Sequence, residues 1–198
     1  MKKLIANTVA LIIILFGTAH AYSTNPEEFV KELIGETILK LSDKTLPEEQ
    51  KKDFIEKIAL ENVDIKALSL YTLGEIRKTI NKDELSNYQA EFEKYFLKSL
   101  TSRLMDYSAT IFEVTGSEQK SANYTIVNSK IIPKDGKPII KIDWRIYTKN
   151  KDKPLIRDLI VEGLSLARTQ KEEFASILSS NDNKINILIN KLEQFTSK

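Results

Sequence analysis

The sequence predicts an α+β domain, with an antiparallel sheet of about four strands covered by helices, a helical N-terminal half and two C-terminal helices. Two changes of periodicity predict this fold class. Over residues 26–107, apolar residues recur at the three- and four-residue spacing of helices. Over residues 109–161 the spacing changes to the alternation of strands, and helical spacing returns from residue 167. An antiparallel sheet with one apolar face needs helices to cover that face.

Proline marks the start of the first two expected helices. Asn25 is a favourable N-cap, and Pro26 fits the first turn, where its missing N–H is not needed. The segment 46–49, Leu-Pro-Glu-Glu, opens the second helix in the same way. Apolar residues at helical spacing follow these two starts: Phe29, Leu33, Ile34, Ile38 and Leu41, then Phe54, Ile55 and Ile58.

The third and fourth helices are expected between residues 65 and 107. Asp64 can cap a third helix over residues 65 to 80. Its first part is apolar on most faces, so we expect it to be buried on two sides. Asn81 or Asp83 begins a long fourth helix. The inward face of this fourth helix is expected to carry Tyr88, Phe92, Phe96, Leu100, Leu104 and Tyr107.

Four strands are expected at residues 109–114, 122–132, 138–147 and 155–161. The segment Lys134-Asp-Gly-Lys137 is typical of a hairpin turn, because glycine tolerates the positive φ that such turns use. Successive strand residues point to opposite faces of a sheet. The third strand therefore carries Ile140, Ile142, Trp144 and Ile146 on one face, and Lys141, Asp143, Arg145 and Tyr147 on the other.

Two helices are expected after the last strand. Gly163 predicts a bend at the end of that strand. Ser165 is a favourable N-cap for a helix over residues 167–179, because its hydroxyl can accept a hydrogen bond from a first-turn N–H. Asn181-Asp-Asn183 predicts a break. The last helix is amphipathic, with Ile185, Leu188, Ile189, Leu192 and Phe195 on its apolar face.

The first 21 residues have the features of a cleaved signal peptide. Two lysines precede a short apolar core at residues 9–16, and Ala19-His20-Ala21 fits a small-x-small cleavage site. The alternative is a membrane anchor, but this apolar stretch falls short of the roughly 20 residues that a span needs. The sequence therefore predicts a signal peptide over residues 1–21, a single mature domain over residues 22–198 and a periplasmic location.

The expected mature chain lacks two reactive side-chain types. The sequence contains no cysteine, and its one histidine, His20, lies in the expected signal peptide. This excludes Ser-His-Asp and Cys-His catalysis and the usual zinc, copper, haem and iron–sulfur ligand sets. The 30 basic and 28 acidic residues become equal in number once Lys2 and Lys3 are removed. Neither nucleic-acid binding nor a polybasic membrane patch is indicated. What remains is a carboxylate, tyrosine or lysine enzyme, or a protein that acts through shape and hydrophobicity.

Three stretches carry a resemblance to a known family. The first is Leu73-Gly74, followed by Phe92-x3-Phe96-x3-Leu100. The second is Asp143-Trp144-Arg145, in the third expected strand. The third is Asp158-Leu-Ile-Val-Glu-Gly-Leu-Ser-Leu166, continued by Thr169-Gln-Lys-Glu-Glu-Phe174. In order and spacing, these stretches resemble the MlaC family of periplasmic phospholipid-shuttle proteins, also called toluene-tolerance or ABC-transporter auxiliary proteins.

The resemblance implies a carrier, not an enzyme, that holds phospholipid acyl chains in a cavity of an NTF2-like or MlaC-like fold. It implies phospholipid as the ligand, with no metal and no other cofactor. The implied partners are an inner-membrane ABC transporter complex and an outer-membrane lipoprotein and porin complex. The carrier would move lipid between them, maintaining outer-membrane lipid asymmetry, without itself spanning a membrane.

The acyl chains are expected to contact apolar residues of the helices and strands, which could instead form an ordinary closed core. Trp144 and Tyr107 are expected at the cavity mouth, because each has an apolar ring with a polar tip. The expected lipid-contacting residues are Leu73, Ile76, Phe92, Phe96, Leu100, Tyr107, Ile140, Ile142, Trp144 and Ile160.

Charged residues of the last two strands have three interpretations. Asp143 and Arg145 on one strand, with Arg157 and Asp158 on the next, could form cross-strand ion pairs on a solvated face. They could also dock a partner protein or take part in catalysis.

Two other functions compete with the carrier. An enzyme of the ketosteroid-isomerase type would place a carboxylate such as Asp158 inside an apolar cavity, near Tyr107 or Tyr124. A pure interaction protein would have a closed core and act through its surface. An apolar cavity of at least roughly several hundred Å³ would favour the carrier.

Overall fold

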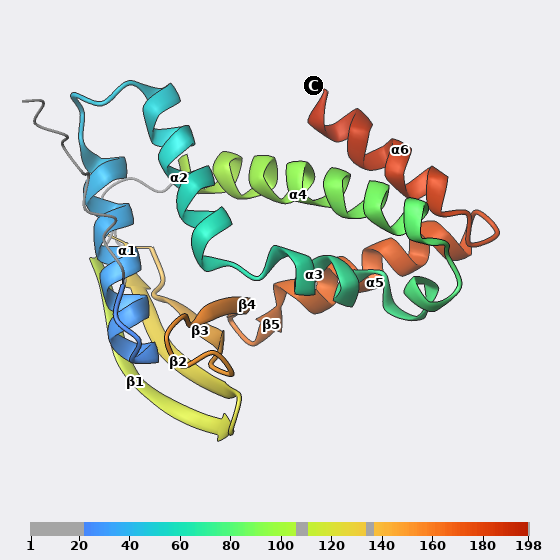
Figure 1. Cartoon of the computed structure of the whole chain (residues 1–198). Coiled ribbons are helices and arrows are strands. Elements are labelled where there is room, and N and C mark those ends of the chain that lie inside the picture. The colour runs from blue at the N-terminus through green and yellow to red at the C-terminus, as the bar shows by residue number, and fades with distance from the viewer. Residues whose placement is uncertain (1–21, 106–110, 134–136, 198) are drawn as a thin grey trace, which may run out of the picture.

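The computed structural model describes residues 22–105, 111–133 and 137–197 (Figure 1). Tyr107, the start of the first expected strand and most of the expected 134–137 turn lie outside these residues. The described elements confirm an α+β fold. In chain order they are α1 (Pro26–Ser42), α2 (Glu48–Asn62), α3 (Ile65–Thr72), the 3-10 helix η1 (Gly74–Lys78), α4 (Lys82–Met105), β1 (Ile111–Ser121), β2 (Tyr124–Ile132), β3 (Ile140–Tyr147), β4 (Leu155–Val161), β5 (Leu164–Ser165), α5 (Leu166–Ser179) and α6 (Ile185–Thr196).

Side-chain caps begin several of these helices, as the sequence predicts. Asn25, Asp64 and Ser165 accept hydrogen bonds from first-turn backbone N–H groups of α1, α3 and α5 at 2.9 to 3.2 Å. At the start of α4, the N–H of Glu84 donates to Asn81 Oδ1 at 2.9 Å, and the N–H of Asn81 donates to Glu84 Oε2 at 3.0 Å. This reciprocal capping selects Asn81, not Asp83, as the start of the helix.

The third helix is shorter than predicted, and the expectation of one helix over residues 65–80 is wrong. Gly74 has a φ of +59°, which a residue with a side chain adopts at a cost of about 1–2 kcal/mol. The backbone therefore leaves the α-helix at this glycine and continues as η1. The turn allows Arg77 to reach back, where its guanidinium donates to the carbonyl oxygen of Leu70 at 3.0 Å.

In the described residues the sheet has five strands in the order β1-β2-β3-β4-β5, each antiparallel to its neighbour, where about four were expected. The extra strand, β5, is two residues long and too short to show alternation. β1 runs to Ser121 and does not end at residue 114, because its pairing with β2 continues past an irregularity at Gly116. The residues after Gly116 are mostly polar, so no apolar alternation marked this extension.

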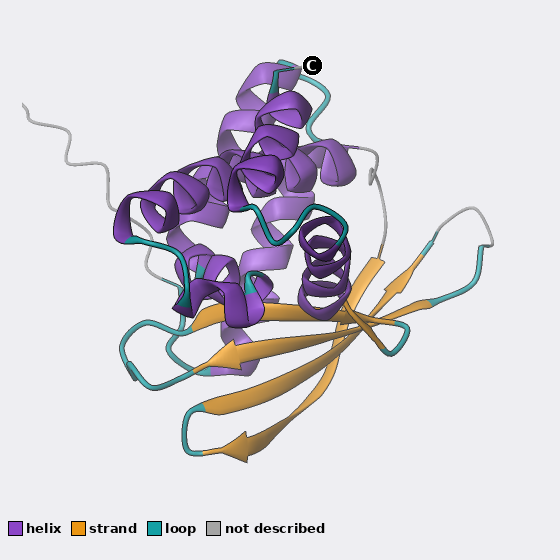
Figure 2. Ribbon diagram, turned by 90° about the vertical axis from the view of Figure 1, so that its right-hand side faces the viewer, coloured by secondary structure: helices purple, strands orange, loops and turns teal. Residues whose placement is uncertain are grey.

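Two hydrophobic clusters of the described residues stabilise the fold. Figure 2 shows the strands in one layer and most of the helices in another. The sheet cluster packs α1 against one face of the sheet and consists of Phe29, Val30, Leu33, Val127, Trp144, Ile146 and Ile156. The helical cluster joins α3, α4, α5 and α6 and consists of Ile65, Leu68, Leu73, Tyr88, Phe92, Phe174, Leu178, Ile185, Leu188, Ile189 and Leu192.

The junction between α2 and α3 connects the two clusters. Val63 packs against both of them and forms a parallel bridge with Ile156 of β4. The next N–H, that of Asp64, donates to the carbonyl oxygen of Ile156 at 2.9 Å. α3 therefore starts beside β4, and the helices of the helical cluster extend away from the sheet (Figure 1). Every helix in the described residues is too short or too polar to span a bilayer.

Candidate functional site

An open groove of about 980 Å³ lies between α3 and the sheet. Asp143 and Arg145 line it, and they flank Trp144, which is buried in the sheet cluster. Because neighbouring residues of a strand point to opposite faces, the groove lies on the face of the sheet that α1 does not cover. The layer between helices and sheet is therefore not filled solid.

The apolar part of the groove wall comes mainly from α3. Leu70 and Tyr71 line the groove and lie outside the helical cluster, and Tyr71 is 41% exposed. This explains why α3 is apolar on most of its faces: one face packs in the helical cluster and another lines the groove. The other apolar lining residues are Ala67, Leu68, Ile126, Ile160 and Ala167.

The rest of the groove wall is polar and carries both signs of charge. Three arginines reach it from η1, β3 and β4. A wall that is apolar along α3 and polar along the sheet suits a small amphipathic molecule. The polar lining residues are Arg77, Glu118, Lys120, Ser121, Tyr124, Asn128, Asp143, Arg145 and Arg157.

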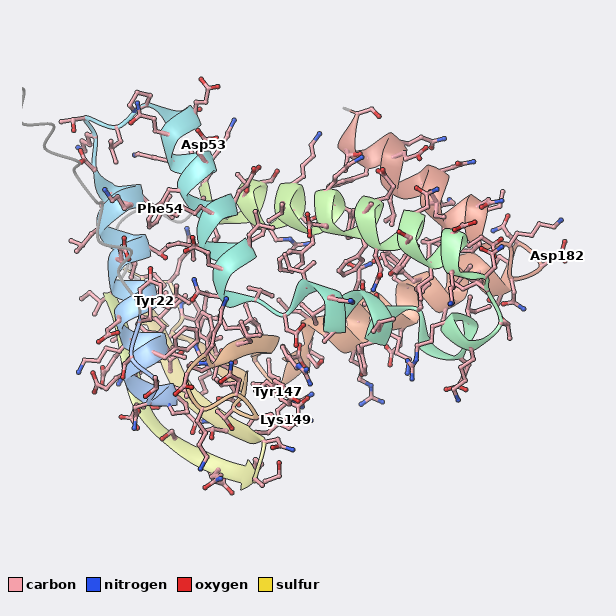
Figure 3. All side chains as sticks on the ribbon, viewed as in Figure 1. Tyr22, Asp53, Phe54, Tyr147, Lys149 and Asp182 are labelled. Atoms are coloured by element: carbon pink, nitrogen blue, oxygen red, sulfur yellow. The ribbon has the colours of Figure 1, made fainter. Side chains whose placement is uncertain are left out.

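Arg157 is held rigidly by three partners. Its guanidinium nitrogens lie 2.7 and 2.8 Å from Asp64 Oδ2. A third nitrogen donates to the Tyr124 hydroxyl at 2.6 Å. The guanidinium carbon lies 3.4 Å from the ring centroid of Tyr147, which is labelled in Figure 3. These contacts join the start of α3 to the sheet at one end of the groove.

Asp158, a residue of β4, is buried beside the start of α5. Its side chain is 1% exposed. Oδ2 accepts from the Ser165 hydroxyl at 2.6 Å, and Oδ1 accepts from the N–H of Ala167 at 3.0 Å. A guanidinium nitrogen of Arg145 lies 3.5 Å from the same carboxylate. Both oxygens are thus engaged in holding the first turn of α5 against β4, where a carboxylate also complements the helix dipole.

The expected cross-strand ion pairs form only in part. Arg145 and Asp158 pair across β3 and β4, but Asp158 is buried and not on a solvated face. Arg157 pairs with Asp64 of the helical layer, not with a strand residue. Asp143 accepts a hydrogen bond from the side-chain amide of Asn128 at 2.8 Å. The face that the sequence predicted as solvated is the sheet-side wall of the groove.

The predicted lipid-contacting residues of the helices lie mostly in the helical cluster. Leu73 and Phe92 are buried within it, and Ile76 and Phe96 pack against it. The ring of Phe92 contacts the ring of Phe96 with centroids 6.3 Å apart. Leu100 is half-buried on α4. Contact of these side chains with a ligand would require the cluster to open, and their role stays a prediction.

The predicted residues of the strands divide between the two faces of the sheet. Ile160 lines the groove. Trp144 belongs to the sheet cluster, with Ile142 packed against it. Trp144 is 6% exposed, and its Nε1–H donates to Ser129 Oγ at 2.8 Å, so its polar tip is satisfied inside the cluster. Ile140 is half-buried at the start of β3.

Leu70, Tyr71 and Ile126 line the groove but are not among the lipid-contacting residues that the sequence predicts. The sequence signal for the α3 residues is the apolar character of that helix on most of its faces, which predicts burial on two sides. Within the described residues, no group of three or more Asp and Glu side chains is placed to hold a metal ion.

A comparison with known protein families shows which family the chain belongs to. The sequence pattern of the family described as "MlaC protein" matches residues 31–194. The chain belongs to the MlaC family. This match includes α3, the whole sheet and α5, and so every element that lines the groove. The resemblance inferred from the three sequence stretches is therefore confirmed.

A solved structure shows the same fold. It is that of the phospholipid-binding protein from Ralstonia solanacearum, solved in complex with a phospholipid. The two chains superpose with a TM-score of 0.71 at 16% sequence identity, covering 90% of this MlaC-family chain and 98% of the other. No curated protein sequence matches the chain significantly.

Proposed function

We propose that this MlaC-family protein is a phospholipid carrier, with the acyl chains sheltered in the groove between α3 and the sheet. The observation that carries the proposal is the groove itself, with an apolar wall from α3 and charged residues on the sheet side. Membership of the MlaC family and the phospholipid bound by the Ralstonia solanacearum protein support it.

The side chains of the groove suit reversible lipid binding. Each buried methylene contributes about 0.8 kcal/mol, so a lipid leaves a bilayer only for a site that shelters comparable apolar surface. Leu70, Tyr71, Ile126 and Ile160 offer aliphatic and aromatic surface without a metal or a covalent bond. Such surface resembles the bilayer interior, so the same lipid can also leave.

The proposed cellular role is lipid movement between two membranes. The signal-like residues 1–21 favour export to the periplasm. There the carrier would exchange lipid with an inner-membrane ABC transporter complex and an outer-membrane lipoprotein and porin complex, and so maintain outer-membrane lipid asymmetry. We propose a carrier and not an enzyme, because Asp158, the candidate catalytic carboxylate, already accepts hydrogen bonds on both oxygens.

Native mass spectrometry of the protein purified from the periplasm tests the proposal. We expect co-purified phospholipid, and we expect Leu70→Glu to reduce lipid occupancy at least several-fold, because a buried charge in the groove wall disfavours acyl chains. Leu39→Glu is the matched control, since Leu39 is 74% exposed on α1 and does not line the groove. Thermal unfolding of both variants verifies that each is folded.

Two results would contradict the proposal. One is a wild-type protein that carries no phospholipid and takes none up from vesicles. The other is a folded Leu70→Glu variant with the same lipid occupancy as the Leu39→Glu variant, which would place the acyl chains elsewhere.

A further inference from the structure

The sheet side of the groove presents an anion and a cation side by side. Asp143 and Arg145 lie two residues apart on β3, on the same face, and both line the groove. Two residues of a strand span about 7 Å. The two charges therefore occupy neighbouring positions on one rigid wall.

Most other charges of the groove are already paired. Arg157 is held by Asp64 at 2.7 Å, and Lys120 lies 2.5 Å from Glu118. Among the described residues Asp143 forms no ion pair, and only its Oδ1 accepts a side-chain hydrogen bond, from the Asn128 amide at 2.8 Å. Its carboxylate can therefore accept further hydrogen bonds from a ligand.

Arg145 also retains binding capacity. Its side chain is 44% exposed, and within the described part of the chain its single ion-pair contact is the 3.5 Å approach to Asp158. That carboxylate is already bound by the Ser165 hydroxyl and the Ala167 N–H. A guanidinium has five N–H donors in a planar fork that matches two oxygens of a phosphate. Arg77 adds a second guanidinium from the opposite, η1 side of the groove.

We propose that this wall binds the zwitterionic headgroup of the carried lipid, with Arg145 holding the phosphodiester and Asp143 holding a primary ammonium. The inference rests on the proposed carrier function. In an ethanolamine phosphodiester, one oxygen and two carbons separate phosphorus from nitrogen, so both charges can reach neighbouring positions of one strand. A primary ammonium donates hydrogen bonds to a carboxylate, whereas a quaternary ammonium has no N–H to donate.

The wall therefore selects an ethanolamine headgroup over a glycerol headgroup, which has a phosphate but no cation. The test is lipid uptake from vesicles that contain equal amounts of phosphatidylethanolamine and phosphatidylglycerol, with the bound lipids counted by native mass spectrometry. We expect the wild-type protein to enrich phosphatidylethanolamine several-fold. Asp143→Asn should remove this enrichment, and Arg145→Gln should lower the retention of both lipids.

Matched controls separate these effects from loss of charge alone. Asp53→Asn changes an exposed residue of α2, which Figure 3 shows well apart from Tyr147 and the groove end of the sheet. Arg168→Gln changes a side chain of α5 that is 73% exposed and does not line the groove. Both should enrich phosphatidylethanolamine as the wild type does. Arg145→Lys keeps the charge without the planar fork and should retain lipid to an intermediate degree.

The outcomes distinguish this inference from the carrier proposal. Lipid uptake without enrichment, or with equal enrichment in Asp143→Asn and Asp53→Asn, overturns the headgroup site and leaves the carrier standing. No lipid uptake by any protein overturns both. Glycerophosphoethanolamine, which lacks acyl chains, is titrated separately. Binding as tight as that of the lipid would identify the ligand as a free phosphodiester and overturn the assignment to a lipid headgroup.

Discussion

Arg157 of β4 and Asp64, the N-cap of α3, form an ion pair with a shortest N–O distance of 2.7 Å. The pair spans the boundary between the sheet and the helical layer, beside the bridge from Val63 to Ile156. It therefore fixes the start of α3 relative to the sheet, and the space between these two elements is the groove.

Arg157→Gln should destabilise the protein by about 1–3 kcal/mol, because it leaves a partly buried Asp64 without its cation and removes the stack on Tyr147. Urea unfolding measures this change. The exposed variant Arg168→Gln should cost at most about 0.5 kcal/mol, since it breaks only a surface pair with Glu172. Equal losses in the two variants would contradict the role of Arg157 in joining the layers.

Two glycines should respond in opposite directions to alanine. Gly74→Ala places a side chain at a φ of +59° and should destabilise the protein by about 1–2 kcal/mol. Gly35→Ala, inside α1, meets no atom within 4 Å and should stabilise it by about 0.5–1 kcal/mol. Thermal unfolding of the pair compares them directly. A stabilising Gly74→Ala would mean that the chain continues as an α-helix at this point.

Ser129→Ala should destabilise the sheet cluster by about 1–3 kcal/mol, because the buried indole N–H of Trp144 loses its acceptor. Trp144 is the only tryptophan in the chain, so its emission reports on this cluster and should shift in the variant. Ser176→Ala, at an exposed position of α5, should change stability by no more than about 0.5 kcal/mol. Unchanged stability and emission in Ser129→Ala would rule out the hydrogen bond.

Alkaline pH should destabilise the helical cluster through Tyr88. Burial raises the pKa of the Tyr88 hydroxyl, and a hydrogen bond with Thr72 lowers it by less, so the net shift is upward from the ordinary value of 10.0. The unfolded chain loses this proton near its ordinary pKa of about 10, and the folded chain loses it only at higher pH. Above pH 10 the unfolded state thus binds fewer protons, and stability falls as pH rises.

Tyr88→Phe removes this titration, at the cost of the 2.8 Å contact between the Tyr88 and Thr72 hydroxyls. Chemical unfolding at pH 8 to 11 should therefore show a shallower loss of stability in the variant than in the wild type. Parallel slopes for the two proteins would show that other groups cause the alkaline loss.

The helix starts and the faces of the strands could be predicted from the sequence because they depend on neighbouring residues. Asn25, Asp64, Asn81 and Ser165 cap helices as expected, since a cap requires only a side-chain oxygen beside first-turn N–H groups. The alternation of β3 placed Trp144 and Arg145 on opposite faces, as observed. These features follow from local geometry.

The groove could not be predicted because it depends on what covers each face. Alternation shows that Asp143 and Arg145 share a face, but it does not show that α3 lies across from them. The aromatic spacing of Phe92 and Phe96 fits a closed core as well as a cavity wall, and in this structure they pack in and against the helical cluster. The break at Gly74 positions Arg77 at the groove, and one glycine in an apolar helix gives only a weak signal of a break.

Quenching by phospholipids with brominated acyl chains tests most directly where the tails lie. Tyr71 lines the groove, and Trp144 lies in the sheet cluster. The double variant Tyr71→Trp, Trp144→Phe therefore has its one tryptophan in the groove, whereas the wild type has its one tryptophan in the sheet cluster. On lipid uptake we predict strong quenching of the tryptophan at position 71 and little quenching of Trp144. Bound lipid that leaves position 71 unquenched, or that quenches Trp144 strongly, would contradict the groove as the lipid site.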